Sequence, residues 1–189
     1  DFIDFVELVE EFKKYTTKEL DFNHEAVNMI RFGRNFEDSD SVLIPKVYKE
    51  YSNDRVLVME LLEGKDLYTA KARLDQRQKK FVVETVSHMI IKQIFEDGFF
   101  HADLHPGNIM YLKENKIGLL DFGIVGYLDK ELKEKLFALF TGLVRGDLIA
   151  VTDSLIEINM GSQDIDREAL KAGLHYTLSD YYDQSASKL

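Results

Sequence analysis

Residues 99–126 read FFHADLHPGNIMYLKENKIGLLDFGIVG, and this stretch decides which fold the sequence predicts. It contains two short apolar runs, residues 109–112 and 117–120, with the polar residues 113–116 between them. Branched and aromatic residues favour strands, and a short polar segment between two such runs is typical of a hairpin loop. The pattern therefore predicts a β-hairpin whose ends determine where the flanking polar residues point.

Three polar residues flank the predicted hairpin: Asp103 and Asn108 precede its first strand, and Asp121 follows its second. Carboxylate and amide oxygens are hard ligands of the kind that bind Mg²⁺ or Mn²⁺. Two carboxylates about 4 Å apart repel each other by roughly 4 kcal/mol at an effective dielectric constant of 20. A site that brings these acids together and also accepts a polyphosphate therefore needs a cation, for which the two carboxylates and the amide are candidate ligands.

The spacing of these residues is that of a protein-kinase catalytic centre. Asp103 and Asn108 form the pattern D-x-x-x-x-N, and Asp121-Phe122-Gly123 is the metal-binding tripeptide that follows it in kinases. Each motif alone is a weak signal. Their order, with one hairpin between them, is strong evidence for an α+β, protein-kinase-like fold with a mostly helical large lobe.

Length, charge and composition exclude several other classes. The chain has 189 residues, which suits one domain with a substantial core, and it contains no cysteine, so disulfides and thiolate metal sites are excluded. A formal net charge of −10 argues against nucleic acid as a partner. No apolar run approaches the roughly 20 residues that span a bilayer, so we expect a soluble chain.

The first 15 residues have an amphipathic helical pattern, with Phe2, Phe5, Val9 and Phe12 on one stripe. Such a stripe needs a partner. Either it packs on the rest of the domain, which we favour, or it marks a cut through a larger protein.

A second helix is predicted over residues 18–36, and the acids Glu19, Asp21 and Glu25 lie near its start. Helix capping is the more common reason for acids in a first turn. The functional alternative is that Glu25 pairs with a phosphate-orienting lysine, as the central helix of a kinase small lobe does.

Residues 42–51 and 55–62 have the composition of two strands joined by a turn at residues 52–54. In a kinase-like domain the exit from the second strand is the hinge between lobes, where backbone groups meet adenine. A long helix over residues 75–96, closed by Gly98, is predicted to support the catalytic loop.

The chain after residue 126 is predicted to be helical scaffold, over residues 129–146, 147–160 and 166–182. Only five residues separate Gly123 from Asp129, and no Ala-Pro-Glu motif follows. The chain therefore lacks the long segment with which protein kinases seat a peptide. We expect a small molecule, a lipid or water as the acceptor.

Several motifs together resemble the UbiB family, also called aarF-domain or ADCK-type atypical kinases. They are Lys18-Glu19-Leu20-Asp21-Phe22, Glu25-Ala26 with Asn28, Pro45-Lys46-Val47-Tyr48, His101-Ala102-Asp103-Leu104-His105-Pro106-Gly107-Asn108, and Asp121-Phe122-Gly123. The resemblance covers most of the chain, and the acidic E-x-D motif at Glu19 and Asp21 is its most specific part.

The resemblance implies a role for each matching position. The implied role is catalytic for Asp103 and for Glu25, which would pair with an ATP-binding lysine. It is metal-binding for Asn108 and Asp121. It is cofactor-binding for two groups of residues: Glu19 and Asp21 of the E-x-D motif, and Met59, Glu60 and Leu62 of the gatekeeper and hinge.

The resemblance also implies cofactors and partners, namely ATP with Mg²⁺ or Mn²⁺, and a lipid or isoprenoid small molecule. Family members are membrane-associated ATPases or atypical kinases linked to ubiquinone or isoprenoid-lipid metabolism. The implied location is the cytoplasm or the cytoplasmic side of a membrane, or the mitochondrial matrix side in a eukaryote, with association through segments absent from this chain.

The chain departs from the family pattern in its first third. It has no K-x-G-Q motif, no Ala- or Gly-rich nucleotide loop and no strand lysine before Glu25. We therefore expect a fragment, with a partial small lobe over residues 1–60 and a large lobe over residues 61–189, that is catalytically inactive alone.

Two alternatives remain. His101, Asp103 and His105 form an H-x-D-x-H string that could bind zinc in a metal-dependent hydrolase. Against it, Pro106 prevents a helical His pair, and the expected role of His101 is packing or hydrogen bonding behind Asp103. The second alternative is a nucleotide-binding pseudokinase that acts as a scaffold, because metal ligands indicate binding and not turnover.

Overall fold

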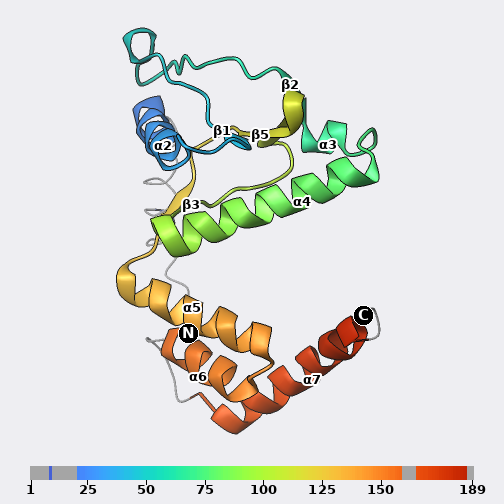
Figure 1. Cartoon of the computed structure of the whole chain (residues 1–189). Helices are drawn as coiled ribbons and strands as arrows, with labels where there is room; N and C mark the ends of the chain where they lie inside the picture. Colours follow the sequence, from blue (N-terminus) through green and yellow to red (C-terminus); the bar gives the residue numbers. More distant parts are fainter. Residues whose placement is uncertain (1–8, 10–20, 159–164, 187–189) are drawn as a thin grey trace. The chain divides into compact units, whose positions relative to one another are not determined.

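The computed structural model describes residues 9, 21–158 and 165–186 (Figure 1). The chain forms two compact units, Asp1–Tyr127 and Leu128–Leu189, which we describe separately. The predicted amphipathic helix over residues 1–15, apart from Val9, and the predicted site residue Glu19 lie outside the described residues. The predicted lobe boundary at residue 60 stays a prediction.

The larger unit contains most of the elements. Its helices are α2 (Phe22–Asn35), α3 (Leu67–Ala70) and α4 (Gln76–Ile91), with the short turns η1 (Lys49–Tyr51), η2 (Lys92–Asp97) and η3 (Lys113–Asn115). Its strands are β1 (Val42–Leu43), β2 (Gly64–Asp66), β3 (Phe99–His101), β4 (Ile109–Leu112), β5 (Lys116–Leu119) and β6 (Val125–Tyr127). The mixture of helix and sheet confirms the predicted α+β class.

The predicted hairpin is present as the antiparallel pair β4 and β5, with Ile109 opposite Leu119. Strand β2 extends it antiparallel to β4, and β1 pairs in parallel with β5, which gives the sheet order β1-β5-β4-β2. Ile109, Ile117 and Leu119 are buried, as expected for runs of branched residues. The hairpin therefore leaves the core at the end that carries Asn108 and Asp121.

A second, two-stranded sheet joins β3 to β6, with His101 opposite Val125. This pairing brings the chain that follows Asp121-Phe122-Gly123 back beside the start of the catalytic loop. The backbone N–H of Ala102 also donates to the Ile124 carbonyl at 3.1 Å. The two motifs are thus fixed at both ends, once by the β4–β5 hairpin and once by the β3–β6 pair.

Helix α2 confirms the second predicted helix and begins at an acidic cap. The Asp21 carboxylate accepts from the Asn23 N–H at 2.9 Å, which satisfies one of the free donors of the first turn. Glu25 lies in the first turn and Arg34 in the last, where each complements the helix dipole. Met29 and Phe32 form its buried side.

Helix α4 and its continuation confirm the long helix predicted over residues 75–96. Asp75 and Gln78 form a reciprocal capping box at its start. After Ile91 the helix widens into the π-helical turn η2, and Gly98 ends it with left-handed backbone angles, φ 59° and ψ 22°. The widened turn contains the buried side chain of Gln93, which contacts the His101 N–H.

The predicted strand pair over residues 42–51 and 55–62 is wrong in most of its length. Only β1 is a strand, and the facing segments meet at the isolated bridges Val47–Met59 and Asn53–Val56. Pro45 has no N–H to give to a ladder, and the Ser52 hydroxyl accepts the Val58 N–H at 3.0 Å. Side-chain hydrogen bonding therefore replaces part of the ladder.

The core of the larger unit gathers around the aromatic rings of α2 and the two motifs. The Phe32 ring lies 4.6 Å from that of Phe99 and 5.1 Å from that of Phe122, measured between centroids. All three side chains are fully buried. Burial of aromatic rings is a large contribution to stability, so α2 is attached to the segments around Phe99 and Phe122 by fully buried rings.

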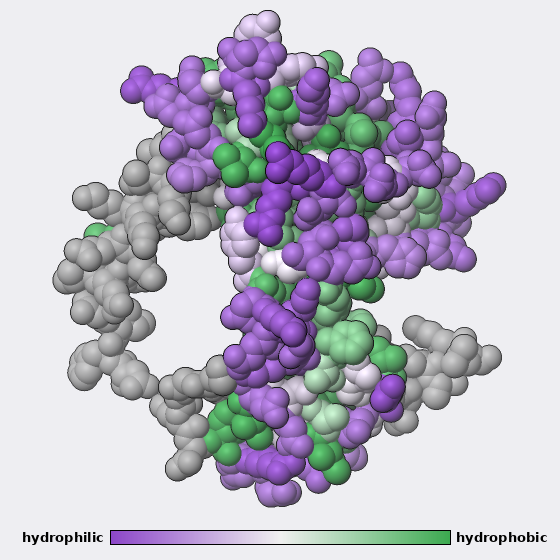
Figure 2. Space-filling view, turned by 60° about the vertical axis from the view of Figure 1, so that its left-hand side comes forward, coloured by the Kyte–Doolittle hydropathy of each residue, from purple (hydrophilic) through white to green (hydrophobic). Residues whose placement is uncertain are grey.

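The smaller unit consists of α5 (Lys130–Arg145), α6 (Leu148–Ile158) and α7 (Arg167–Ala186). The helices predicted over residues 129–146, 147–160 and 166–182 are confirmed there, with Asp129 as the cap of α5 and Gly146 as its left-handed end. Figure 2 shows hydrophilic residues over most of the larger unit's visible face and hydrophobic patches on the smaller unit. No helix in the described part of the chain is long and apolar enough to cross a membrane.

Candidate functional site

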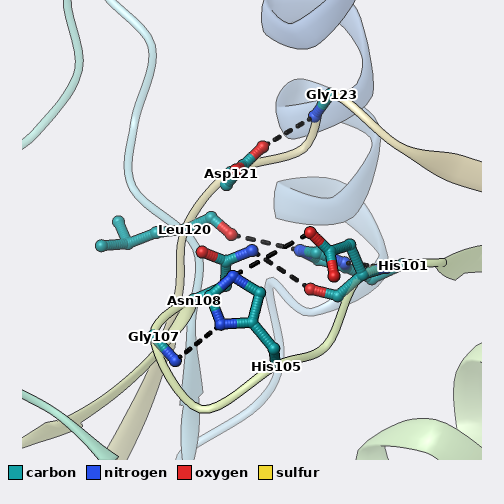
Figure 3. A network of polar contacts seen from close by, with 8 residues as sticks. His101, His105, Gly107, Asn108, Leu120, Asp121 and Gly123 are labelled. Atoms are coloured by element: carbon teal, nitrogen blue, oxygen red, sulfur yellow. Dashed lines mark hydrogen bonds and ion pairs between the residues drawn. The ribbon is translucent and has the colours of Figure 1, made fainter. Parts of the chain in front are cut away.

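The loop between β3 and β4 is built around His101, which is almost completely buried. Its Nδ1 accepts from the Asp103 N–H at 3.1 Å, and its Nε2 lies 3.1 Å from the Leu120 carbonyl oxygen (Figure 3). Because Nδ1 is an acceptor, the proton of the neutral ring belongs on Nε2, which donates to Leu120. His101 thus links the two motifs, and the role predicted for it behind Asp103 is confirmed.

Both ring nitrogens of His101 are occupied by backbone groups, so this ring is not oriented to bind a metal. The described residues also contain no group of three or more His, Cys, Asp or Glu side chains placed to hold an ion. Of the two histidines in the H-x-D-x-H string, His101 thus has no ring nitrogen free to bind zinc, and the hydrolase alternative stays a prediction.

Asp103 and Asn108 are held at opposite ends of one tight loop. The Asp103 carbonyl accepts from the Asn108 side-chain amide at 3.1 Å and from the His105 N–H at 2.9 Å. Asn108 is buried, whereas the Asp103 side chain is 43% exposed. Since the amide nitrogen of Asn108 faces this carbonyl, its oxygen points away from the loop backbone. Asp103 keeps an exposed carboxylate that a bound molecule can reach.

Asp121 follows β5 and lies beside Asn108. The Leu120 N–H donates to the Asn108 carbonyl at 2.9 Å, which continues the hairpin to the residue next to Asp121. Asp121 has a positive φ of 57°, a left-handed conformation that costs an ordinary residue roughly 1–2 kcal/mol. Its Oδ1 accepts from the Gly123 N–H at 3.3 Å (Figure 3). Such a conformation persists only where neighbouring contacts enforce it.

The contacts that hold Asp121 come from α2 and act on the next residue, Phe122. Glu25 Oε1 accepts from the Phe122 N–H at 3.1 Å, and the Asn28 side-chain amide donates to the Phe122 carbonyl at 2.9 Å. The Phe122 ring is fully buried, with its centroid 5.4 Å from that of His101. Helix α2 therefore binds both polar groups of one residue, and we call Glu25 and Asn28 the α2 clamp.

The structure gives the two predicted acidic residues Glu25 and Asp21 different contacts. Glu25 lies at the site and accepts from the Phe122 N–H, and its predicted pairing with a lysine stays a prediction. Asp21 caps α2 and has His24 Nε2 3.9 Å from its Oδ2. The capping explanation for Asp21 is thus confirmed, and its predicted cofactor role stays a prediction.

The predicted hinge residues lie in an irregular, partly exposed segment. Met59 forms the bridge with Val47, and the Glu60 N–H donates to the Lys46 carbonyl at 2.8 Å. Leu62 is buried, and the space above Gly118 is filled by its Cδ1 atom. The Glu60 N–H is consequently already paired inside the chain, while the predicted contacts of Met59, Glu60 and Leu62 with adenine are not tested by the geometry.

Comparison with known proteins identifies the family. The profile described as the ABC1 atypical kinase-like domain matches residues 1–155. The chain belongs to the ABC1 atypical kinase-like family. It is 39% identical to a probable protein kinase UbiB of Photobacterium profundum over 71% of this chain and 26% of the relative. It is 30% identical to an uncharacterized chloroplastic aarF domain-containing protein kinase of Arabidopsis thaliana, over 98% of this chain and 25% of the relative.

A solved structure shares the fold of this ABC1-family chain. It is the complex of Rv3197 with erythromycin from Mycobacterium tuberculosis, with a TM-score of 0.65 and 22% identity over 93% of this chain and 44% of that one. The chain spans about a quarter of the length of the two curated relatives. The predicted kinase-like fold and the resemblance to UbiB proteins are confirmed.

Two residues at this ABC1-family site carried no predicted role. Asn28 is one half of the α2 clamp. Gln93 is fully buried in η2, and its Oε1 accepts from the His101 N–H at 2.9 Å. Gln93 follows Met89 by four residues and so falls on the buried stripe of the predicted helix, where a polar side chain needs a partner. A polar residue on an apolar stripe is the sequence signal that could have identified Gln93. Nothing in the sequence indicated that its partner is the His101 N–H.

Proposed function

We propose that this domain binds a magnesium–nucleotide complex between Asp121 and the loop that contains Asp103 and Asn108. We propose further that it is the nucleotide-binding domain of an atypical kinase or ATPase. The observation that supports this most directly is the hydrogen bond from Leu120 to Asn108, which places the two predicted metal ligands at one end of one hairpin. Asp103 is the proposed catalytic residue, because its exposed carboxylate lies in the same loop.

The donor atoms at this site suit Mg²⁺ or Mn²⁺. Asn108 offers an amide oxygen turned away from the loop, and Asp121 offers an exposed carboxylate. Hard oxygen ligands of this kind, with nucleotide phosphates completing the shell, are what Mg²⁺ prefers. When bound, the ion would offset the negative charge of the phosphates and of the developing transition state. The residues of the chain hold the ligand atoms in place before binding.

The proposed acceptor is a small molecule or a lipid, in agreement with the short path after Gly123. Strand β6 begins at Val125 and pairs with β3, and α5 begins at Lys130. This leaves no long segment on which a peptide could lie. Similarity to UbiB proteins supports a link to ubiquinone or isoprenoid-lipid metabolism, and we extend the proposal to a cytoplasmic or membrane-associated location.

A pseudokinase scaffold is the second candidate, and one observation favours it. Glu25 has a structural contact with the Phe122 backbone, so its presence does not require a catalytic lysine. A domain could keep this contact and the metal ligands while it binds a nucleotide without turnover. We also propose that the chain alone is inactive, since it lacks the nucleotide loop and strand lysine of the family pattern.

The test uses the full-length protein that contains this domain. Binding and hydrolysis of ATP are measured with and without Mg²⁺ in the wild type, Asp103→Asn and Asp121→Asn. The proposal predicts Mg²⁺-dependent binding that Asp121→Asn abolishes, and hydrolysis that Asp103→Asn abolishes while binding persists. Binding without turnover in the wild type would select the scaffold. Absence of any Mg²⁺-dependent nucleotide binding would contradict both candidates.

A further inference from the structure

His105 lies two residues after Asp103, and its ring is fixed by the loop itself. The Gly107 N–H donates to His105 Nδ1 at 3.0 Å, and His105 Nε2 lies 4.0 Å from Asp103 Oδ2 (Figure 3). An acceptor Nδ1 places the proton of the neutral ring on Nε2. The N–H of this imidazole therefore faces the carboxylate proposed to act in catalysis.

Gly107 supplies the space that the His105 ring needs. A Cβ atom at Gly107 would lie 2.6 Å from His105 Cε1 and 3.0 Å from Nδ1, so any side chain at Gly107 would require the His105 ring to move. The backbone of Gly107 does not require glycine, because the described glycines with a positive φ are Gly98 and Gly146. Glycine at position 107 is thus explained by the space that the His105 ring occupies and not by the backbone conformation of Gly107.

This arrangement contributes little to folding stability. The side chains of His105 and Asp103 are 55% and 43% exposed, and ion pairs at such exposure are worth at most about 1 kcal/mol. The 4.0 Å separation is also longer than a hydrogen bond. Catalytic hydrogen bonds are often long before substrate binds and shorten in the complex. A fixed ring at this distance is therefore suited to orientation of the carboxylate.

We propose that His105 is a positioning residue for Asp103, held by Gly107 in the tautomer whose Nε2–H faces the carboxylate. In this role the imidazole restricts the rotation of the Asp103 side chain and keeps one of its oxygens turned toward the acceptor group. The inference rests on the proposed function for the significance of Asp103, and on the loop geometry alone for the tautomer and for the role of Gly107.

The first test is independent of any activity. Nitrogen-15 NMR of histidine-labelled, nucleotide-free full-length protein, at a pH that keeps imidazoles neutral, reports the tautomer of His105, and His105→Gln assigns its signals. We expect the Nε2–H tautomer in the wild type and a shift toward a mixture in Gly107→Ala. The Nδ1–H tautomer in the wild type, or an unchanged tautomer in Gly107→Ala, would overturn the proposal.

The second test separates positioning from binding. The kcat and KM for Mg-ATP are compared in His105→Leu, which removes the donor, and in His105→Gln, whose side-chain amide can replace it. His88→Leu on the exposed side of α4 is the matched control. We expect a loss in kcat of about tenfold for His105→Leu, with little change in KM, recovery in His105→Gln, and no effect of the control.

The outcomes of the two tests are distinguishable. Equal losses in His105→Leu and His105→Gln, or a change confined to KM, would contradict the positioning role even where the wild type is active. Failure of the wild type to turn over Mg-ATP would contradict the proposed catalytic function, and the NMR result would still decide whether Gly107 fixes the ring.

Discussion

The predicted catalytic segments, residues 101–108 and 120–123, and the predicted hinge lie in the same compact unit but are held in different ways. In the first of these regions, side chains bind the backbone of the predicted site residues or of their neighbours: the α2 clamp binds the N–H and the carbonyl of Phe122, and His101 links Asp103 to Leu120. In the predicted hinge, Glu60 and Lys46 are joined by a backbone hydrogen bond and by an exposed carboxylate contact, and Leu61 is 85% exposed.

This difference indicates where a substitution will matter. Where side chains position a site, a single change removes both an interaction and the geometry that depends on it. Where the backbone positions it, most side chains can change with small effect. The following predictions test this contrast, from the largest expected effect to the smallest.

Phe122→Ala is expected to lower the free energy of unfolding by about 3–5 kcal/mol, because it empties a fully buried aromatic site at the centre of the catalytic segments. Chemical denaturation of the purified protein measures the change. Leu61→Ala in the exposed hinge is the control and should change stability by less than about 0.5 kcal/mol. Similar losses of stability in Phe122→Ala and Leu61→Ala would contradict the difference proposed between the two regions.

Asn28→Ala is expected to cost about 1–2 kcal/mol and to weaken Mg²⁺-dependent nucleotide binding, since the Phe122 carbonyl loses its side-chain donor and Asp121 loses part of its support. Denaturation and calorimetry measure the two effects. Asn23→Ala, on the exposed first turn of the same helix, is the control. If both variants bind nucleotide as the wild type does, the α2 clamp does not position the metal ligand.

Asp21 allows capping to be separated from the predicted cofactor role. Asp21→Ala should cost about 1 kcal/mol through loss of the helix cap, while Asp21→Ser keeps a capping oxygen and should restore most of it. If Asp21 also has its predicted cofactor role, nucleotide affinity falls in both variants. Wild-type nucleotide affinity in Asp21→Ser would show that Asp21 caps the helix and has no cofactor role.

Glu60→Gln should have the smallest effect, less than about 0.5 kcal/mol and no measurable change in nucleotide affinity. The exposed Glu60 side chain accepts from the Lys46 N–H at 3.2 Å, and a glutamine oxygen can still accept there. Denaturation and nucleotide titration check both values. A clear loss of affinity would show that the hinge acts through this carboxylate and not through its backbone.

The features that the sequence could predict are those set by local patterns, and the features that it missed depend on tertiary contacts. The hairpin, the helix caps at Asp21 and Asp129, the helix end at Gly98 and the role of His101 followed from local patterns, and the structure confirms them. The strand pair over residues 42–62 was wrong because the Ser52 hydroxyl and Pro45 alter the ladder through contacts that composition does not reveal.

The α2 clamp could not be predicted for a different reason. Glu25 and Asn28 meet Phe122 across 97 and 94 residues, so only the tertiary fold shows the partner. Gln93 is a polar residue on an apolar stripe, and only the fold shows that its partner is the His101 N–H. Residue types at a site can thus be found from motifs, whereas the residues that hold them depend on packing between distant segments.

The most direct test of the central claim is to locate the bound metal. Amide NMR signals of the full-length protein are recorded with a nucleotide while paramagnetic Mn²⁺ is added in place of Mg²⁺. The account predicts that line broadening appears first at Asn108, Asp121 and Phe122 and is lost in Asp121→Asn. Broadening centred on another part of the chain, or unchanged in Asp121→Asn, would contradict it.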